Sequence, residues 1–194
     1  MNLESLGISP DWEEPLLAVF DKYDIMTIDR QASFIGQCAH ESANFKRLQE
    51  NLNYSATGLV GSWPSRFMNA DFAASYAHNP EKIANMVYGG RMGNTEDGDG
   101  WSYRGRGLIM ITGREAYGNV GSALSLDLIN DPDLLLDPAN AAMSAGWFWN
   151  KKGLNALADS QDYREMTRRI NGGFIGLDER IEKIHAAMDM LSQG

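Results

Sequence analysis

The chain has little of several features that define large classes of protein. It contains one cysteine, Cys38, in 194 residues, so no disulfide can form within it. It also has no apolar run long enough to span a bilayer. The first residues lack the basic and apolar segments of a classical secretion signal, so we expect synthesis in a cytoplasm. These absences exclude a disulfide-rich secreted module and a stably inserted membrane protein.

Positive charge is also scarce. Lys and Arg number 17 against 26 Asp and Glu, which gives a formal net charge of −9. This balance argues against a nucleic-acid partner, because polyphosphate binding relies on clustered cations. With 43% hydrophobic residues, the chain can bury one full core, and we expect a single monomeric domain over residues 1–194. The acidic run at 97–100 lacks the further ligands of a calcium loop, so we expect neither metal nor cofactor.

Helix signals recur along the chain, whereas convincing alternating strands are absent. A capping residue followed by proline is typical of a helix start, and it occurs at Ser9-Pro10, Asn79-Pro80 and Asp137-Pro138. Ser160 is expected to cap a helix that ends at Asn171, and a last helix is expected from about Asp178. The sequence therefore predicts an all-α fold with at most a small β-hairpin, after Glu50 or in the glycine-rich loop.

Glu41 lies on the apolar side of a helix predicted over residues 27–45. Phe34, Cys38 and Phe45 share its spacing, and the four positions fall within about 60° of arc. A carboxyl group in partly apolar surroundings can stay protonated near neutrality, as a general acid must. The alternative is a carboxylate at the border of the buried stripe, paired with an arginine.

Glu50 follows nine residues later. On one straight helix it would lie about 13.5 Å along the axis and on the opposite side, whereas inverting glycosidases hold two carboxylates roughly 6.5–9.5 Å apart. We therefore expect the helix to end between Phe45 and Glu50 and both acids to face one cleft. Asn51 and Asn53 are weak helix formers and favour such a break. The alternative for Glu50 is a solvated turn carboxylate.

A glycine-rich loop with several arginines follows. Eight glycines occur in residues 88–113, and the arginines in or beside this stretch are Arg91, Arg104, Arg106 and Arg114. Glycine lets backbone approach a ligand closely, and guanidinium groups suit carboxylates. Loops of this length in a compact domain are usually functional or disordered. The arginines are expected either to bind substrate carboxylates or to pair with the acids at 96–99.

Aromatic rings can stack on sugar rings. The aromatic candidates in loop-like sequence are Trp63, Trp101 and Tyr103, while Tyr54 and Tyr117 could be structural or ligand-binding. Trp147 and Trp149 lie on a helical run and are expected in the core. His40 points about 100° away from Glu41 and is expected to be structural.

Six ordered motifs resemble glycoside hydrolase family 19, in particular its phage endolysin branch. They are AHESANF (39–45), ENLNYSATGL (50–59), NPEKIANMVY (79–88), RMGN (91–94), YRGRGLIMITGR (103–114) and INGG (170–173). The resemblance implies a lysozyme-like bilobal helical fold and an inverting single displacement. It also implies roles by position: Glu41 as general acid, Glu50 as second acid, Thr112 as holder of the attacking water, Asn171 in the sugar subsites and Arg180 near the acid.

One position departs from the family pattern. Met110 stands where the family usually has glutamine, so a contact to a sugar amide would be lost. The residues expected to bind substrate are Tyr54, Trp101, Tyr103, Arg104, Arg106, Tyr117, Asn171 and Arg180. We expect an endolysin that hydrolyses peptidoglycan glycan strands, is made in a host cytoplasm and acts in the periplasm after membrane permeabilisation. The alternatives are a chitinase, a lytic transglycosylase and a glycan-binding module without activity.

Overall fold

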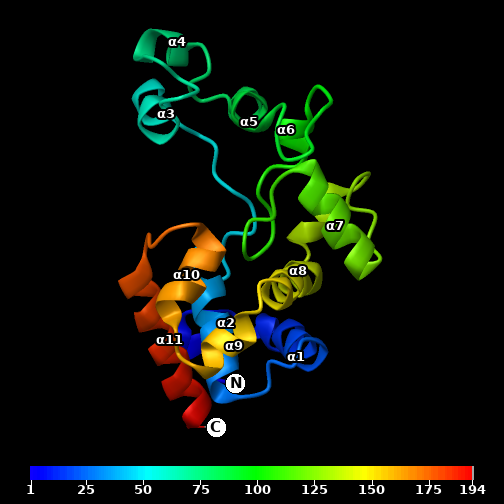
Figure 1. Ribbon diagram of the computed structural model, residues 1–194, viewed down its shortest axis with the longest axis vertical. Helices are drawn as coiled ribbons and strands as arrows, with labels where there is room; N and C mark the ends of the chain where they lie inside the picture. The colour runs from blue at the N-terminus through cyan, green and yellow to red at the C-terminus, as the bar shows by residue number, and fades with distance from the viewer. Residues whose placement is uncertain (194) are drawn as a thin grey trace. The chain divides into compact units, whose positions relative to one another are not determined.

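The computed structural model describes residues 1–193 and shows helices joined by loops (Figure 1). The chain forms two compact units, one of residues 1–48, 107–109 and 135 onward, and the other of residues 49–106 and 110–134. The predicted mainly helical, lysozyme-like fold class is confirmed. The prediction of a single domain stays a prediction.

The first unit contains the chain's two ends and its longest helices. These are η1 (Leu3–Leu6), η2 (Pro10–Trp12), α1 (Glu13–Lys22), α2 (Ile28–Glu41), α8 (Pro138–Lys151), α9 (Leu154–Asp159), α10 (Tyr163–Asn171) and α11 (Leu177–Ser192). The second unit contains α3 (Ala56–Ser62), α4 (Ala70–Ala74), α5 (Pro80–Tyr88), α6 (Asp99–Ser102) and α7 (Arg114–Leu124). The short helix η3 (Pro132–Leu136) crosses from the second unit into the first.

Strand pairing is minimal. Within residues 1–193 it consists of isolated antiparallel bridges, from Gln49 to Arg106 and from Arg106 to Ile111. These bridges bring the segment before Glu50 against the glycine-rich loop. Among the described residues, no helix is both long and apolar enough to cross a lipid bilayer.

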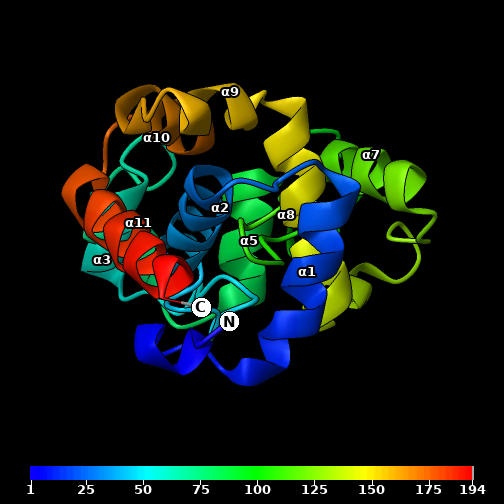
Figure 2. The same ribbon diagram turned by 90° about the horizontal axis from the view of Figure 1, so that it is seen from below.

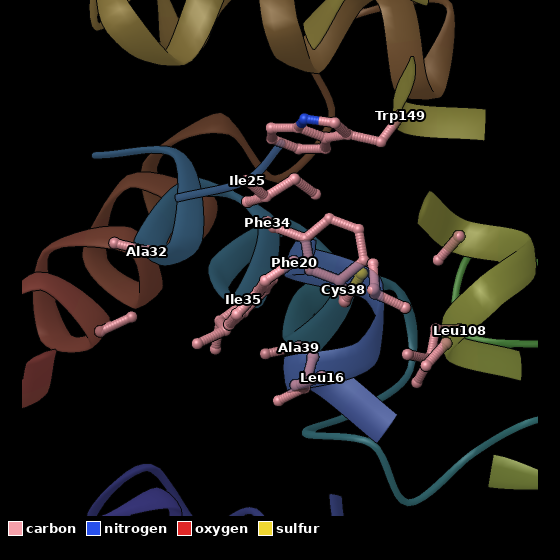
Figure 3. Close-up of a cluster of buried hydrophobic side chains, with 14 of the residues drawn as sticks. Leu16, Phe20, Ile25, Ala32, Phe34, Ile35, Cys38, Ala39, Leu108 and Trp149 are labelled. Carbon is pink, nitrogen blue, oxygen red and sulfur yellow. The ribbon is translucent and has the colours of Figure 1, made fainter. Parts of the chain in front are cut away.

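The core of the first unit is built around α2. Phe34 packs edge-on against Phe20 and Trp149, with ring centroids 5.9 and 5.4 Å apart (Figure 3). Cys38 is buried in the same cluster, and burial raises the pKa of its thiol. Aromatic pairs of this geometry add to the free energy gained by burying apolar area. The face of α2 that bears Phe34 and Cys38 is thereby fixed in the core.

Helix α11 lies against α2 in both views of the molecule (Figures 1 and 2). Gly36 permits this contact, because a Cβ atom there would lie 2.7 Å from the backbone nitrogen of Ile184. A residue with a side chain could not occupy this position without moving one of the two helices. The close approach places Gln37 and Glu41 of α2 beside the first turn of α11.

The predicted helix starts are largely confirmed. Ser9, Asn79 and Asp137 each accept a hydrogen bond from the backbone at the start of their helices. The predicted cap at Ser160 is wrong: Ser160 ends α9, and the side chain of Asp162 caps α10 instead. The predicted end of α10 at Asn171 is confirmed, with Gly172 in the left-handed region at φ 76°.

Helix α2 ends at Glu41, earlier than predicted. Ala43, Asn44 and Phe45 all have positive φ angles, 51°, 56° and 64°, which no right-handed helix allows. Ser42 stabilises this turn, since its Oγ donates to the Cys38 carbonyl at 2.6 Å and accepts from the Phe45 amide at 3.0 Å. Phe45 therefore reaches the core from a turn rather than from the helix.

The second unit has a smaller core of its own, between α3, α4 and α5. Its buried side chains are Leu52, Leu59, Phe67, Ala73, Ile83, Ala84 and Val87. Tyr54 and Trp63 pack on this core edge to face, with centroids 4.9 Å apart. The core supports α5, whose last residue is Tyr88.

Candidate active-site residues

In the first unit, Glu41 is held by an arginine of α11. Arg180 donates from Nη2 to Glu41 Oε1 at 2.5 Å and from Nη1 to Gln37 Oε1 at 2.7 Å. Gln37 and Glu41 lie one turn apart on α2, so one guanidinium fork spans both. The Glu41 side chain is 21% exposed and that of Arg180 is 2% exposed. In the part of the chain that is described, Oε2 of Glu41 receives no hydrogen bond.

Glu41 thus lies at the border of the buried face of α2 and pairs with an arginine, as the alternative interpretation held, and its role as general acid stays a prediction. Arg180 lies near the acid, as the family resemblance implied. Its burial is at odds with the predicted contact to substrate, and we assign it to holding Glu41.

His40 packs against the loop before α11, with its ring directly under Gly176. Its Nδ1 lies 3.2 Å from Glu179 Oε2. Burial lowers the pKa of His40, and the nearby guanidinium of Arg180 lowers it further. These contacts fit the structural role predicted for this histidine.

Asn171 is exposed at the end of α10, where the chain turns through two glycines toward α11. The same loop contributes the Ile175 carbonyl, which accepts from Arg180 Nε at 3.3 Å. The loop that presents Asn171 is thereby connected through Arg180 to Glu41. The predicted role of Asn171 in binding sugar stays a prediction.

In the second unit, Glu50 accepts hydrogen bonds at both carboxylate oxygens. The Tyr88 hydroxyl donates to Oε2 at 2.7 Å, and the Gly105 amide donates to Oε1. The Glu50 amide in turn donates to the Gly105 carbonyl at 3.0 Å. Glu50 is therefore a half-buried, oriented carboxylate rather than a freely solvated turn residue.

Gly105 allows this arrangement. A Cβ atom there would lie 3.2 Å from Glu50 Oε1 and 3.3 Å from the Cβ of Met110, tighter than ordinary contacts. The glycine thus lets the loop backbone reach the carboxylate. Met110, which replaces the usual glutamine of the family, lies at the same place with φ 55°.

Arg104 is buried in the loop beneath Trp101. Its guanidinium carbon lies 3.7 Å from the centroid of the Trp101 ring, and its Nη2 donates to Gln49 Oε1 at 2.9 Å. Burial lowers the pKa of Arg104, and the neighbouring charge of Arg106 lowers it further. The half-buried Trp101 ring is thus fixed by a cation on one face.

Three buried side chains lie on the inner side of the glycine-rich loop: Tyr103, Arg106 and Tyr117. Arg106 is 2% exposed, and its Nη2 pairs with Asp133 at 2.7 Å. Tyr117 is fully buried, donates to the Arg104 carbonyl and receives a hydrogen bond from Arg106. Burial raises its pKa to about 12. The Tyr103 hydroxyl donates to the Ile129 carbonyl at 3.0 Å. This burial is at odds with the predicted substrate contacts, and we assign all three residues to holding the loop.

Thr112 is half-buried at the end of the same loop. Its hydroxyl donates to the Met110 carbonyl at 2.9 Å, so its lone pairs are left to accept from a ligand.

Of the remaining arginines, Arg114 pairs with Asp99 at 2.9 Å, as the alternative interpretation held. Tyr54 packs on Trp63 with part of its surface exposed.

The sequence does not single out three residues around the acids: Gln37, which shares Arg180 with Glu41, and Tyr88 and Gly105, which donate to Glu50. Tyr88 lies in one of the recognised motifs, but its partner Glu50 is 38 positions away, and the motif alone carries no sign of the contact. The sequence shows Gly105 as one of eight loop glycines, and nothing in it distinguishes this position from the others. Gln37 lies one turn before Glu41, and that spacing could have indicated a shared partner.

Comparison with known proteins adds evidence on ancestry. The family model for glycoside hydrolase family 19, described as chitinase class I, matches residues 18–158. A glycosyl hydrolase family 19 domain-containing protein of Haemophilus influenzae is 39% identical over 177 residues, covering 90% of this chain and 86% of that protein. An endochitinase of Arabidopsis thaliana is 47% identical over 75 residues, which are only 26% of its length.

Solved structures agree on the fold. Chitinase C from Streptomyces griseus matches 95% of this chain and 70% of its own with a TM-score of 0.61, at 21% identity. That likeness supports the lysozyme-like helical architecture, while the sequence matches carry the family assignment. The match over residues 18–158 includes both acids, the glycine-rich loop and Thr112. The chain therefore belongs to glycoside hydrolase family 19 and is a chitinase-like glycoside hydrolase.

Proposed function

We propose that the enzyme cleaves the glycan strands of bacterial peptidoglycan by an inverting mechanism with two carboxylates. Glu41 is the general acid that protonates the leaving sugar oxygen, and Glu50 is the base that activates water. Thr112 accepts a hydrogen bond from that water. The observation that carries these roles is the contrast between the carboxylates: Glu41 has one oxygen without a donor, whereas Glu50 is hydrogen-bonded at both.

The difference in hydrogen bonding between Glu41 and Glu50 matches the different requirements of a general acid and a general base. A group that gives and regains a proton needs an oxygen free to face the leaving atom, and Oε2 of Glu41 meets that need. A base that removes a proton from water works best as an oriented anion, and donors on both oxygens provide the orientation. A module that only binds glycans would need neither arrangement.

The choice of peptidoglycan over chitin rests on the glycine-rich loop. Met110 replaces the family glutamine that would contact a sugar amide, and the exposed Arg91 supplies a cation in the glycine-rich loop. Peptidoglycan carries lactyl and peptide carboxylates that chitin lacks, so a guanidinium favours it. Chitin remains the second candidate, because several relatives are named endochitinases. We place the action at the cell wall, reached after membrane permeabilisation.

The products distinguish these functions. Purified peptidoglycan and chitin oligomers are each incubated with the enzyme, and the products are identified by mass spectrometry. A reducing muramic acid or glucosamine end supports hydrolysis of peptidoglycan, whereas an anhydro sugar would show a lytic transglycosylase. Products from chitin alone would favour a chitinase. Proton NMR of the first-formed anomer tests inversion directly.

The acid is tested by Glu41→Gln, which preserves shape and removes the transferable proton. We expect turnover to fall by about 10²–10⁴-fold, the range typical of general acid–base groups. Circular dichroism and thermal unfolding check that the variant is folded. Glu182→Gln, at an exposed acid on α11, is the matched control and should keep its turnover. A folded Glu41→Gln enzyme that kept more than about a tenth of normal turnover would exclude the assignment.

A further inference from the structure

Tyr88 has a hydroxyl group aimed at the second carboxylate. It is the last residue of α5, and its Oη lies 2.7 Å from Glu50 Oε2. Burial raises the pKa of Tyr88, and the charge of Glu50 raises it further. The hydroxyl therefore keeps its proton across the neutral range and acts as the donor in this hydrogen bond.

Both ends of Tyr88 are fixed. At the backbone, Asn94 donates from Nδ2 to the Tyr88 carbonyl at 3.0 Å, and Asn94 is only 1% exposed. The other amide atom of Asn94 accepts from the Arg114 amide at 2.8 Å, which connects α5 to the start of α7. The backbone that carries the hydroxyl is thus held by contacts that do not involve Glu50.

We propose that Tyr88 is a positioning residue for Glu50: with the Gly105 amide, it orients the carboxylate and maintains it as the anion that accepts a proton from water. Each carboxylate oxygen can accept about two hydrogen bonds, and these donors occupy one on each oxygen. The remaining sites are left to the attacking water. This inference rests on the proposed role of Glu50.

The other ionisable groups around this pair are few. Tyr54 and Arg91 act on Tyr88, and Arg104 and Tyr117 lie close enough to Glu50 to interact with its charge. Tyrosine and arginine ordinarily titrate at about 10 and above 12. A change in the acidic limb of the pH–rate profile after altering Tyr88 is therefore assigned to a carboxylate.

The test is Tyr88→Phe, which removes the hydroxyl and keeps the ring. A hydrogen bond to a charged group is worth enough for kcat to fall by about 10- to 100-fold, with KM changed by less than about threefold because substrate binding is not touched. The acidic limb of kcat/KM should move to higher pH, since the anion has lost a donor. Tyr76→Phe, which removes a hydroxyl elsewhere in the same unit, should leave both the rate and the limb unchanged.

A second variant tests the proposal if the Tyr88→Phe protein does not fold. Fluorinated tyrosine installed at position 88 keeps the packing and strengthens the donor, so the acidic limb should move to lower pH. An unchanged limb in either folded variant would overturn the proposal, and so would an equal loss of rate at every pH. Glu50→Gln separates the proposed role of Glu50 from the inference about Tyr88. If Glu50→Gln stays active, Glu50 is not the base. If Glu50→Gln is inactive and Tyr88→Phe behaves like the wild type, only the inference about Tyr88 is refuted.

Discussion

Arg180 shows how one side chain can organise the surroundings of an acid. Its guanidinium donates to a side-chain amide, a carboxylate and a backbone carbonyl, which belong to Gln37, Glu41 and Ile175. Lysine could not reproduce this, because an ammonium group is a point charge without the planar fork of arginine. Since Arg180 is 2% exposed, each of these bonds is made away from water.

We therefore expect Arg180→Lys to lower the free energy of unfolding by about 1.5–3 kcal/mol, the range for hydrogen bonds to charged groups. Hydrolysis should fall as well, because Glu41 would lose its fixed orientation. Urea denaturation and the hydrolysis rate measure the two effects. Arg168→Lys is the control: its side chain is 54% exposed in its pair with Glu165, and surface pairs contribute only about 0–1 kcal/mol. Equal stability losses in both variants would contradict the role of Arg180.

Single residues differ in how far the sequence predicted them. Spacing made Glu41 and Glu50 candidates but left an alternative open for each, and the resemblance to family 19 assigned their roles, which stay predictions. Arg106 and Tyr117 could not be assigned correctly, since a loop sequence does not say which arginine turns inward to meet Asp133. Tyr88 could not be linked to Glu50 because their contact depends on the path of the whole segment between them, which contains α3, α4 and most of α5.

At the scale of elements, helix starts were predicted better than helix ends. A cap such as Asp137 followed by proline acts within one turn, so the sequence contains the whole signal. The end of α2 depends instead on Ser42 and on three left-handed residues that include no glycine. Phe45 has φ 64°, and its ring packs on Trp12, a contact between distant parts of the chain that the local sequence does not show.

The contact between α2 and α11 gives a prediction for these elements. Gly36→Ala should lower the free energy of unfolding by about 1–3 kcal/mol, because the added methyl group overlaps the Ile184 backbone. Hydrolysis should fall in the folded fraction too, since Arg180 lies one turn from Ile184 on the displaced helix. Thermal unfolding and the specific rate measure these changes.

Gly61→Ala is the matched control. Gly61 lies in α3, and a Cβ atom there would meet nothing within 4 Å. Alanine favours a helix over glycine by up to about 1 kcal/mol, so this variant should be unchanged or slightly more stable. A Gly36→Ala protein as stable and active as the wild type would show that α11 can shift without moving Arg180.

The charge of the whole molecule bears on its choice of polymer. The sequence indicated that a chain at −9 needs local cations to bind an anionic glycan. The structure reduces the number of such cations, because Arg106 pairs with Asp133 and Arg114 with Asp99. Arg104 is itself buried against Trp101, so Arg91 is left as the exposed arginine of the loop. Long-range repulsion between the acidic chain and peptidoglycan should therefore be only partly offset.

This repulsion is testable by varying salt. Raising the ionic strength from about 0.01 M to 0.15 M shortens the screening length from about 30 Å to about 8 Å, so cleavage of peptidoglycan should become faster. Soluble chitin oligomers are neutral, and their cleavage should change little. Replacing Glu4, Glu14 and Asp21, which are exposed acids of the first unit, with Gln, Gln and Asn should reproduce the gain at low salt. If the rate on peptidoglycan instead falls with salt, local attraction by the exposed Arg91 outweighs the net charge, and Arg91→Gln should abolish that dependence.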